Sequence, residues 1–139
     1  MIKEFQREHR FLSNFWPAEV YLDGIKYPTV EHAYQASKTL DDEERKIVRM
    51  AGRPGLAKRE GKRVTLRPDW SDEMKLVIME DLVRQKFQHK ELKALLLATG
   101  DEELVEGNSW WDTYWGVCKG KGSNHLGKIL MKVRQELDK

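Results

Sequence analysis

Three carboxylates with aromatic neighbours are the side chains of this sequence best suited to acid/base chemistry. Glu31 lies in a segment with helical periodicity, whereas Asp69 and Asp112 lie beside tryptophans. A carboxyl group in such surroundings can have a raised pKa and exchange a proton, or it can stay ionised and stabilise a developing cation. The alternative for each of the three is an ordinary surface acid. Lys38 follows Glu31 by two helical turns, so both side chains could border one cleft.

Other catalytic chemistries find little support. The four histidines show no metal-ligand spacing, and no G-x-S-x-G nucleophile motif is present. The single cysteine, Cys118, excludes a disulfide framework and a cysteine-rich zinc site, and a lone cysteine is typical of a small buried hydrophobe. We therefore expect neither a metal nor another cofactor.

Charge is unevenly distributed along the chain. The 139 residues include 25 basic and 23 acidic side chains, and the formal net charge of +2 excludes a uniformly basic nucleic-acid-binding protein. The basic segment, residues 45–70, nevertheless contains nine Lys or Arg and only two acids, and residues 113–135 contain five basic side chains and no acid. The two segments could converge on phosphate groups; the alternative is a solvated charged surface.

A glycine-rich turn and the tryptophans point to ligand binding. Residues 120–128 read GKGSNHLGK, in which glycine lets backbone N–H groups approach an anion and a helix N-terminus adds positive charge. A P-loop is excluded because Ile129 stands where Ser or Thr would hold magnesium; a turn that only begins a helix is the alternative. Rings in turn-like surroundings suit stacking on a planar ligand or plugging the core. The tryptophans are Trp16, Trp70, Trp110, Trp111 and Trp115.

These residues must be positioned by a mainly α chain with a small N-terminal β-hairpin. Alternating residues around Asp23-Gly24 predict the hairpin over 19–27. Helical periodicity and capping residues predict helices over about 29–40, 41–52, 55–61, 71–88, 90–99 and 124–137. Residues 107–122 are expected to be loop. The length indicates one domain, 1–139, and without an apolar stretch of membrane-spanning length we expect a soluble, cytoplasmic protein with no membrane contact.

An ordered set of short motifs resembles the NADAR family of YbiA-like N-glycosidases. The motifs cover nearly the whole chain, and the longest are FLSNF (11–15), YPTVEHAYQASK (27–38), LRPDW (66–70), DTYWG (112–116) and GKGSNHLG (120–127). The resemblance implies a single-domain YbiA-like helical fold and cleavage of a C1′–N glycosidic bond. It also implies a phosphoribosyl or ADP-ribosyl substrate, either an early pyrimidine intermediate of riboflavin synthesis or ADP-ribosyl-guanine in DNA or RNA, with an ADP-ribosyltransferase as partner in the second case.

The same resemblance assigns roles to residues. It places Glu31, Asp112 and Trp70 at catalytic positions, and an oxocarbenium-like state needs the anionic stabilisation and proton transfer that the two carboxylates could supply. Lys38 could instead attack the opened sugar as a Schiff-base nucleophile. The expected substrate-binding residues, including stacking and phosphate-holding groups, are Asn14, Arg53, Arg67, Trp115, Gly116, Lys121, Gly122, Ser123 and Asn124. The pair Trp110-Trp111 departs from the family's pattern.

Two other function classes remain open. One is a non-catalytic module that binds ADP-ribose or a nucleotide, and the other is a nucleic-acid-binding protein that uses the basic segment. The joint presence of Glu31, Asp112 and Lys38 favours the enzyme. Binding alone would need the basic loop and the aromatic rings but not the acids.

Overall fold

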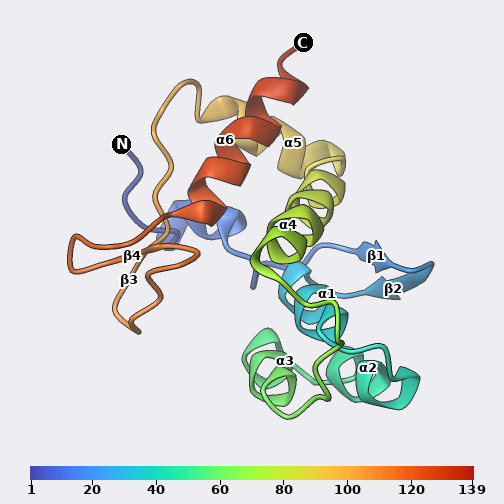
Figure 1. Cartoon of the computed structure of the whole chain (residues 1–139). Helices are drawn as coiled ribbons and strands as arrows, with labels where there is room; N and C mark the ends of the chain where they lie inside the picture. The colour runs from blue at the N-terminus through green and yellow to red at the C-terminus, as the bar shows by residue number, and fades with distance from the viewer. The chain divides into compact units, whose positions relative to one another are not determined.

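In the computed structural model, which describes residues 1–139, the chain is divided into two units (Figure 1). The central unit consists of residues 14–86, and the terminal unit consists of residues 1–13 and 87–139. Helices make up most of the central unit and are the longest elements of the terminal unit, and the small N-terminal sheet predicted from the sequence is present in the central unit. The fold class is therefore confirmed, whereas the single domain over 1–139 stays a prediction.

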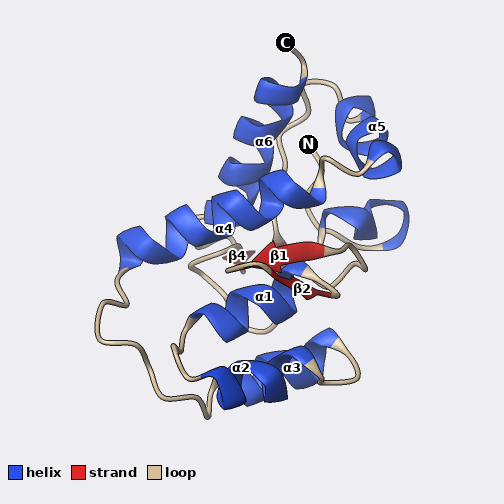
Figure 2. Cartoon of the chain, turned by 90° about the vertical axis from the view of Figure 1, so that its right-hand side faces the viewer, coloured by secondary structure: helices blue, strands red, loops and turns tan.

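The central unit is assembled around one fully buried helix, α1. Its elements are β1 (Val20–Leu22), β2 (Ile25–Tyr27), α1 (Val30–Ser37), α2 (Asp42–Arg49), α3 (Pro54–Gly61) and α4 (Asp72–Lys86). Helix α1 packs against α2 and α3 on one side and against α4 on the other (Figure 2). All eight of its residues are buried. Polar side chains of α1 are consequently held inside the unit.

Short-range signals in the sequence explain how the central unit begins. Strands β1 and β2 pair antiparallel, and both residues of the turn between them have positive φ, as a two-residue Asp23-Gly24 hairpin requires. Thr29 caps α1 as predicted, since its hydroxyl accepts the N–H of His32 at 3.0 Å. The His32 ring is buried; its Nε2–H donates to the carbonyl of Ala51 at 2.9 Å, which leaves Nδ1 to accept from the Thr29 hydroxyl at 2.8 Å.

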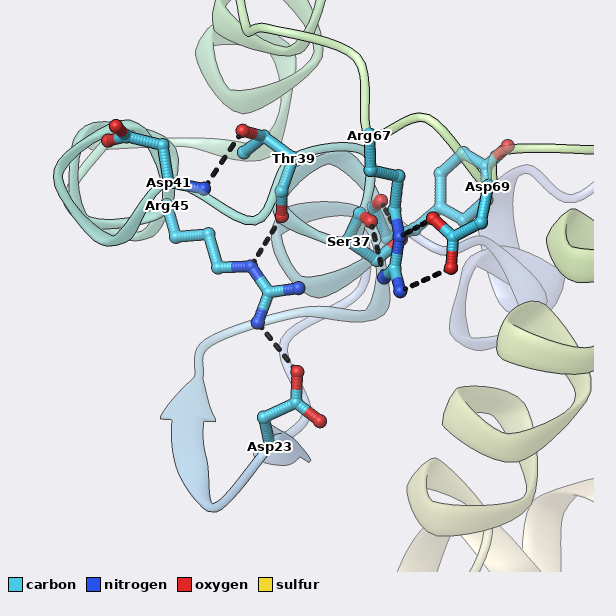
Figure 3. Close-up of polar contacts among 8 residues, drawn as sticks. Asp23, Ser37, Thr39, Asp41, Arg45, Arg67 and Asp69 are labelled. Carbon is cyan, nitrogen blue, oxygen red and sulfur yellow. Dashed lines mark hydrogen bonds and ion pairs between the residues drawn. The ribbon is translucent and has the colours of Figure 1, made fainter.

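A buried arginine, Arg45, links helix α2 to the β1–β2 turn. Arg45 donates through Nε to the carbonyl of Thr39 at 2.7 Å and through its guanidinium to the Asp23 carboxylate at 2.7 Å (Figure 3). It therefore ties the start of α2 to the β1–β2 turn. This use of a basic side chain differs from the phosphate binding considered for the basic segment.

The terminal unit combines two helices with short, irregular pieces of chain. Its elements are a 3₁₀ helix η1 (Arg7–Leu12), α5 (Lys90–Ala98), β3 (Gly107–Asn108), β4 (Val117–Cys118) and α6 (His125–Leu137). Helix α5 packs against α6 and η1, and β3 pairs parallel with β4. The sequence did not predict η1 or the two strands, because each element is too short to show a period. No helix of the chain has the length and apolar character needed to cross a membrane.

Candidate active site

Glu31 is the most deeply enclosed of the expected catalytic carboxylates. It lies in the first turn of α1 with 8% of its surface exposed, and its N–H donates to the carbonyl of Asn14 at 3.1 Å. The side chain of Gln35, one turn further along α1, donates to Glu31 Oε2 at 2.6 Å. Asn14 is itself buried, with its amide nitrogen 3.5 Å from the sulfur of Met79. The carboxylate is therefore largely removed from water and held in one orientation.

Gln35 is a functional candidate that was not among the site residues expected from the sequence. Its carbonyl oxygen is buried without a hydrogen-bond partner, so the amide turned toward Glu31 is the group that is satisfied. Gly61, the last residue of α3, makes room for this side chain, because a Cβ at Gly61 would collide with the Gln35 carboxamide. The sequence signal was the i, i+4 spacing of Glu31 and Gln35 on one helix.

Lys38, at the C-cap of α1, is half-buried beside an aromatic ring. Its amine lies 5.7 Å from the centroid of the Tyr34 ring. Burial lowers the pKa of Lys38, and this effect outweighs the opposite influence of the Glu31 charge; the positive charges of Lys75, Lys58 and Lys62 lower it further. A larger share of this amine is therefore neutral near pH 7 than of an exposed lysine.

Trp70 lies against the same helix, and a clamp formed by the hydrogen bonds of Arg67 holds the loop before it. Its ring centroid is 5.9 Å from that of Tyr34, with the two planes tilted by 54°. The backbone N–H of Arg67 donates to the carbonyl of Lys38 at 2.7 Å. The Arg67 guanidinium donates to both carboxylate oxygens of Asp69, at 2.7 and 3.0 Å, and to the carbonyl of Ser37 at 3.3 Å (Figure 3). The loop before Trp70 is thereby fastened to the end of α1.

This clamp changes the interpretation of two expected site residues. The hydrogen bond from Arg67 lowers the pKa of Asp69, so this third carboxylate is an ionised partner of Arg67 and is not suited to donate a proton. The Arg67 guanidinium is engaged with three acceptors, which makes it a positioning group here. Arg53 has an exposed side chain at the N-cap of α3 and stays a predicted phosphate-binding residue.

In the terminal unit, Asp112 organises a tight turn. One of its carboxylate oxygens accepts the N–H groups of Tyr114 and Trp115, at 3.1 and 2.9 Å. Its backbone is paired with Asn108, whose side chain accepts the Asp112 N–H at 3.1 Å and donates to the Asp112 carbonyl at 2.9 Å. The ring of Trp115 lies edge-on to Tyr114, with centroids 4.8 Å apart. The carboxylate is therefore fixed by its own turn.

The glycine-rich turn at the start of α6 is used for folding. The N–H groups of residues 123–126 donate to carbonyl oxygens of residues 113–116 at 2.8 to 3.2 Å. These amides, which the sequence suggested for a phosphate, are thus occupied by the chain itself. A Cβ at Gly122 would collide with the Gly116 carbonyl, and a Cβ at Gly116 would collide with Glu106. Both glycines are required where the two segments meet.

Three further residues of this turn have different surroundings. Asn124 is buried in the left-handed conformation with φ of 54°, so α6 begins one residue later than predicted. Its side chain accepts the N–H of Glu106 and donates to the carbonyl of Leu104, both at 3.0 Å, which is a structural task. Lys121 and Ser123 have exposed side chains and stay predicted binding residues.

The expected site residues thus form two groups, each within one unit. Around α1 the structure brings together Asn14, Glu31, Lys38 and Trp70, with Gln35 added. Around the start of α6 it brings together Asp112, Trp115, Gly116, Gly122, Ser123 and Asn124. The first group offers a buried carboxylate, an amine of lowered pKa and an aromatic platform, which is a combination suited to glycoside chemistry.

Comparisons with known proteins agree with this chemistry. The NADAR domain matches residues 2–138. The N-glycosidase YbiA of Escherichia coli (strain K12) is 44% identical over 131 residues, which cover 90% of this chain and 79% of that protein. A riboflavin biosynthesis protein of Vibrio vulnificus (strain YJ016) is 41% identical over 138 residues, which cover 96% of this chain and 37% of that protein.

The fold can be compared with a solved structure. The NMR structure of the E. coli protein YbiA matches 99% of this chain and 85% of that chain, with a TM-score of 0.84 and 41% identity. The YbiA-like helical fold that the motifs implied is thereby confirmed. Since the family match spans nearly all of the sequence and the fold agrees, the chain belongs to the NADAR domain family.

Proposed function

We propose that this N-glycosidase hydrolyses the C1′–N bond between an amine and the ribose of a phosphoribosyl or ADP-ribosyl group. The curated relatives named N-glycosidase support a hydrolase acting on N-glycosyl bonds, and the relative named for riboflavin biosynthesis supports a small glycosylated substrate. The observation that carries the proposal is the buried, oriented carboxylate of Glu31 on the same helix face as Lys38.

In the carboxylate route, Glu31 acts on the sugar directly. Bond cleavage builds positive charge at C1′, which the Glu31 carboxylate stabilises more strongly in its water-poor surroundings than it would in water. A second carboxyl group donates its proton to the leaving nitrogen as the bond from C1′ breaks, and the carboxylate that this leaves takes a proton from the water molecule that attacks C1′. Asp112 is the proposed second carboxylate, and Trp70 and Trp115 are the proposed stacking rings for the planar part of the substrate.

The lowered pKa of Lys38 favours a second route for an ADP-ribosyl substrate. The neutral amine attacks C1′ of the ring-opened sugar, the bond from C1′ to the leaving nitrogen breaks as that nitrogen takes a proton, and a Schiff base forms. Water then hydrolyses the Schiff base and restores the amine. Borohydride added during turnover should trap the sugar on Lys38, detected by peptide mass spectrometry; turnover without any adduct would assign the reaction to the carboxylates.

Phosphate binding is proposed for the basic side chains near the Lys38 amine. Lys58, Lys62 and Lys75 lie close enough to Lys38 to influence its charge, so their ammonium groups supply a positive field over the same part of the central unit. Arg53, in the same unit, is proposed to add to it, and Lys121, in the terminal unit, stays a proposed phosphate-binding residue. A phosphate placed in this field would also help to hold the ribose for attack.

The substrate class is decided by offering both candidates in parallel. The wild-type chain is incubated with the phosphoribosylamino-pyrimidine and with DNA that carries ADP-ribosyl-guanine, and the products are identified by mass spectrometry. Release of the pyrimidine assigns a riboflavin-pathway intermediate as substrate. Release of ADP-ribose assigns modified nucleic acid, which an ADP-ribosyltransferase must supply. If neither bond is broken, the proposed substrate classes are wrong.

Glu31→Gln separates catalysis from binding. The substitution keeps the size of the side chain but removes its charge, so turnover should fall by about a hundredfold or more, while calorimetry should show ADP-ribose binding within a few-fold of wild type. A variant with full activity would show that Glu31 has no role in the reaction. A wild-type chain that binds ADP-ribose without turning over any substrate would instead be a non-catalytic binding module.

A further inference from the structure

Trp110, the first residue of the Trp110-Trp111 pair, borders a groove in the terminal unit. The groove has a volume of about 510 Å³ and is lined by residues from the N-terminal segment, from β3 and the residues after it, and from β4 and the turn that follows. Trp110 is one of its walls and is 50% exposed. The polar groups that line it include Lys3, Asn108, Ser109 and Lys119. A half-exposed indole that shares a groove with polar side chains is a surface on which a flat ring can stack.

Trp111 holds Lys119, one of the two lysines that line this groove, in place. The amine of Lys119 lies 4.4 Å from the centroid of the Trp111 ring, a cation–π contact on a ring that is 67% exposed. Both residues have positive φ, 67° for Trp111 and 52° for Lys119, which is costly for residues other than glycine. The backbone is therefore strained at the two positions that bring the indole and the amine together.

The charge of the groove favours an anion. Lys3 and Lys119 are the basic side chains that line it, and Glu4 is the acidic one. The Glu4 carboxylate lies 3.8 Å from the guanidinium of Arg7, which offsets its charge. Two ammonium groups beside a stacking surface match a ligand that is planar at one end and negatively charged at the other.

We propose that this groove is a binding site for a nucleobase that carries a phosphate, with Trp110 stacking on the base and Lys119 and Lys3 holding the phosphate. The base and phosphate can belong to a free nucleotide or to a single strand of nucleic acid. None of these residues has a role in the proposed reaction, and the site stands whether or not that reaction is the right one.

Photo-crosslinking maps the site with a free nucleotide. The full chain is illuminated with 8-azidoadenosine monophosphate and the labelled tryptic peptides are identified; the Glu31→Gln chain serves in parallel, so that turnover cannot consume the probe. We expect label on peptides from residues 1–6 or 105–120. Label confined to the central unit, or no label at all together with no strand binding, would overturn the proposal.

Fluorescence anisotropy with a short labelled oligothymidylate tests whether the groove binds a single strand of nucleic acid. Trp110→Ala and Lys119→Glu should each weaken binding of the preferred probe by about tenfold or more, and Trp110→Phe should restore most of the loss because a ring remains. Lys93→Glu, a charge reversal at an exposed position of α5, is the matched control and should change binding little. Melting temperatures confirm that the variants are folded. Binding that is unchanged by Trp110→Ala and Lys119→Glu would contradict the proposed site.

Discussion

The chemistry of Glu31 depends on a neighbour that shares its helix. The Gln35 amide approaches Glu31 Oε2 at 2.6 Å, and Gly61 leaves the space in which the carboxamide lies. Both side chains are buried, so water does not readily replace the donor if it is lost. We therefore regard Gln35 as a positioning residue for the proposed catalytic carboxylate.

Gln35→Ala should lower kcat by about tenfold to a hundredfold, the range expected when a charged group loses a buried hydrogen bond. The acidic limb of the pH–rate profile should also move to higher pH, because the ionised carboxylate loses a donor that favours it. Gly61→Ala, whose new methyl group displaces the carboxamide, should have the same two effects. Gln88→Ala, at an exposed position, is the control. An unchanged pH profile in both variants would leave Gln35 with a packing role alone.

At the scale of elements, the turn that begins at Asp112 allows the charge of this carboxylate to be tested separately from its hydrogen bonds. Two N–H groups donate to one oxygen of its carboxylate, and an asparagine amide oxygen can accept both in the same place. Asp112→Asn should therefore keep the melting temperature near that of wild type and lose activity, whereas Asp112→Ala should lose activity and also about 1 to 2 kcal/mol of unfolding free energy. Thermal melts and steady-state kinetics on both variants decide this. Full activity in Asp112→Asn would mean that the turn matters and the charge does not.

Elements with local causes could be predicted from the sequence. The Thr29 cap and the Asp23-Gly24 hairpin follow from side chains within a few residues, and both are present. The remaining features depend on residues that are distant in the chain. Asn124 takes a left-handed conformation because its side chain is bonded to residues 104 and 106, and no pattern around position 124 contains that information.

The site was predicted in the same uneven way. Motif resemblance selected Glu31, Lys38 and Trp70, which the structure gathers around α1. It could not show that Arg67 would be engaged by Asp69, since a guanidinium bound to a nearby carboxylate and one that awaits a phosphate have the same sequence. Partners of long polar side chains are set by packing, and packing is not visible in a list of residue types.

For the molecule as a whole, the net charge conceals how basic side chains are used. In the basic segment, Arg45, Arg63 and Arg67 pair with carboxylates of the central unit, and Arg45 is buried. The charge that this segment can offer to phosphates is therefore smaller than its composition indicates. Lys58 and Lys62, which influence Lys38, remain the members with a direct electrostatic link to the proposed site.

Buried titratable groups give the stability of the protein a characteristic pH dependence. Burial lowers the pKa of Lys86 to about 7 and also lowers the pKa of His32, so at neutral pH the unfolded chain binds more protons at both residues than the folded one. The unfolding free energy must then rise with pH, through His32 near and below pH 6.5 and through Lys86 above pH 7. Burial raises the pKa of Tyr27, which reverses the trend above about pH 10, where the unfolded tyrosine ionises first.

Lys86→Met tests this dependence directly. Methionine does not titrate, so the unfolding free energy of wild type should rise relative to that of the variant by up to about 1 kcal/mol per pH unit as the pH increases from 7 towards 9.5. Urea unfolding at pH 6, 7.5 and 9.5 measures the difference, with Lys90→Met at an exposed position as control. A difference between Lys86→Met and wild type that is the same at all three pH values would mean that Lys86 keeps its proton in the folded protein. The buried ammonium would then have to be stabilised by its surroundings strongly enough to outweigh its desolvation.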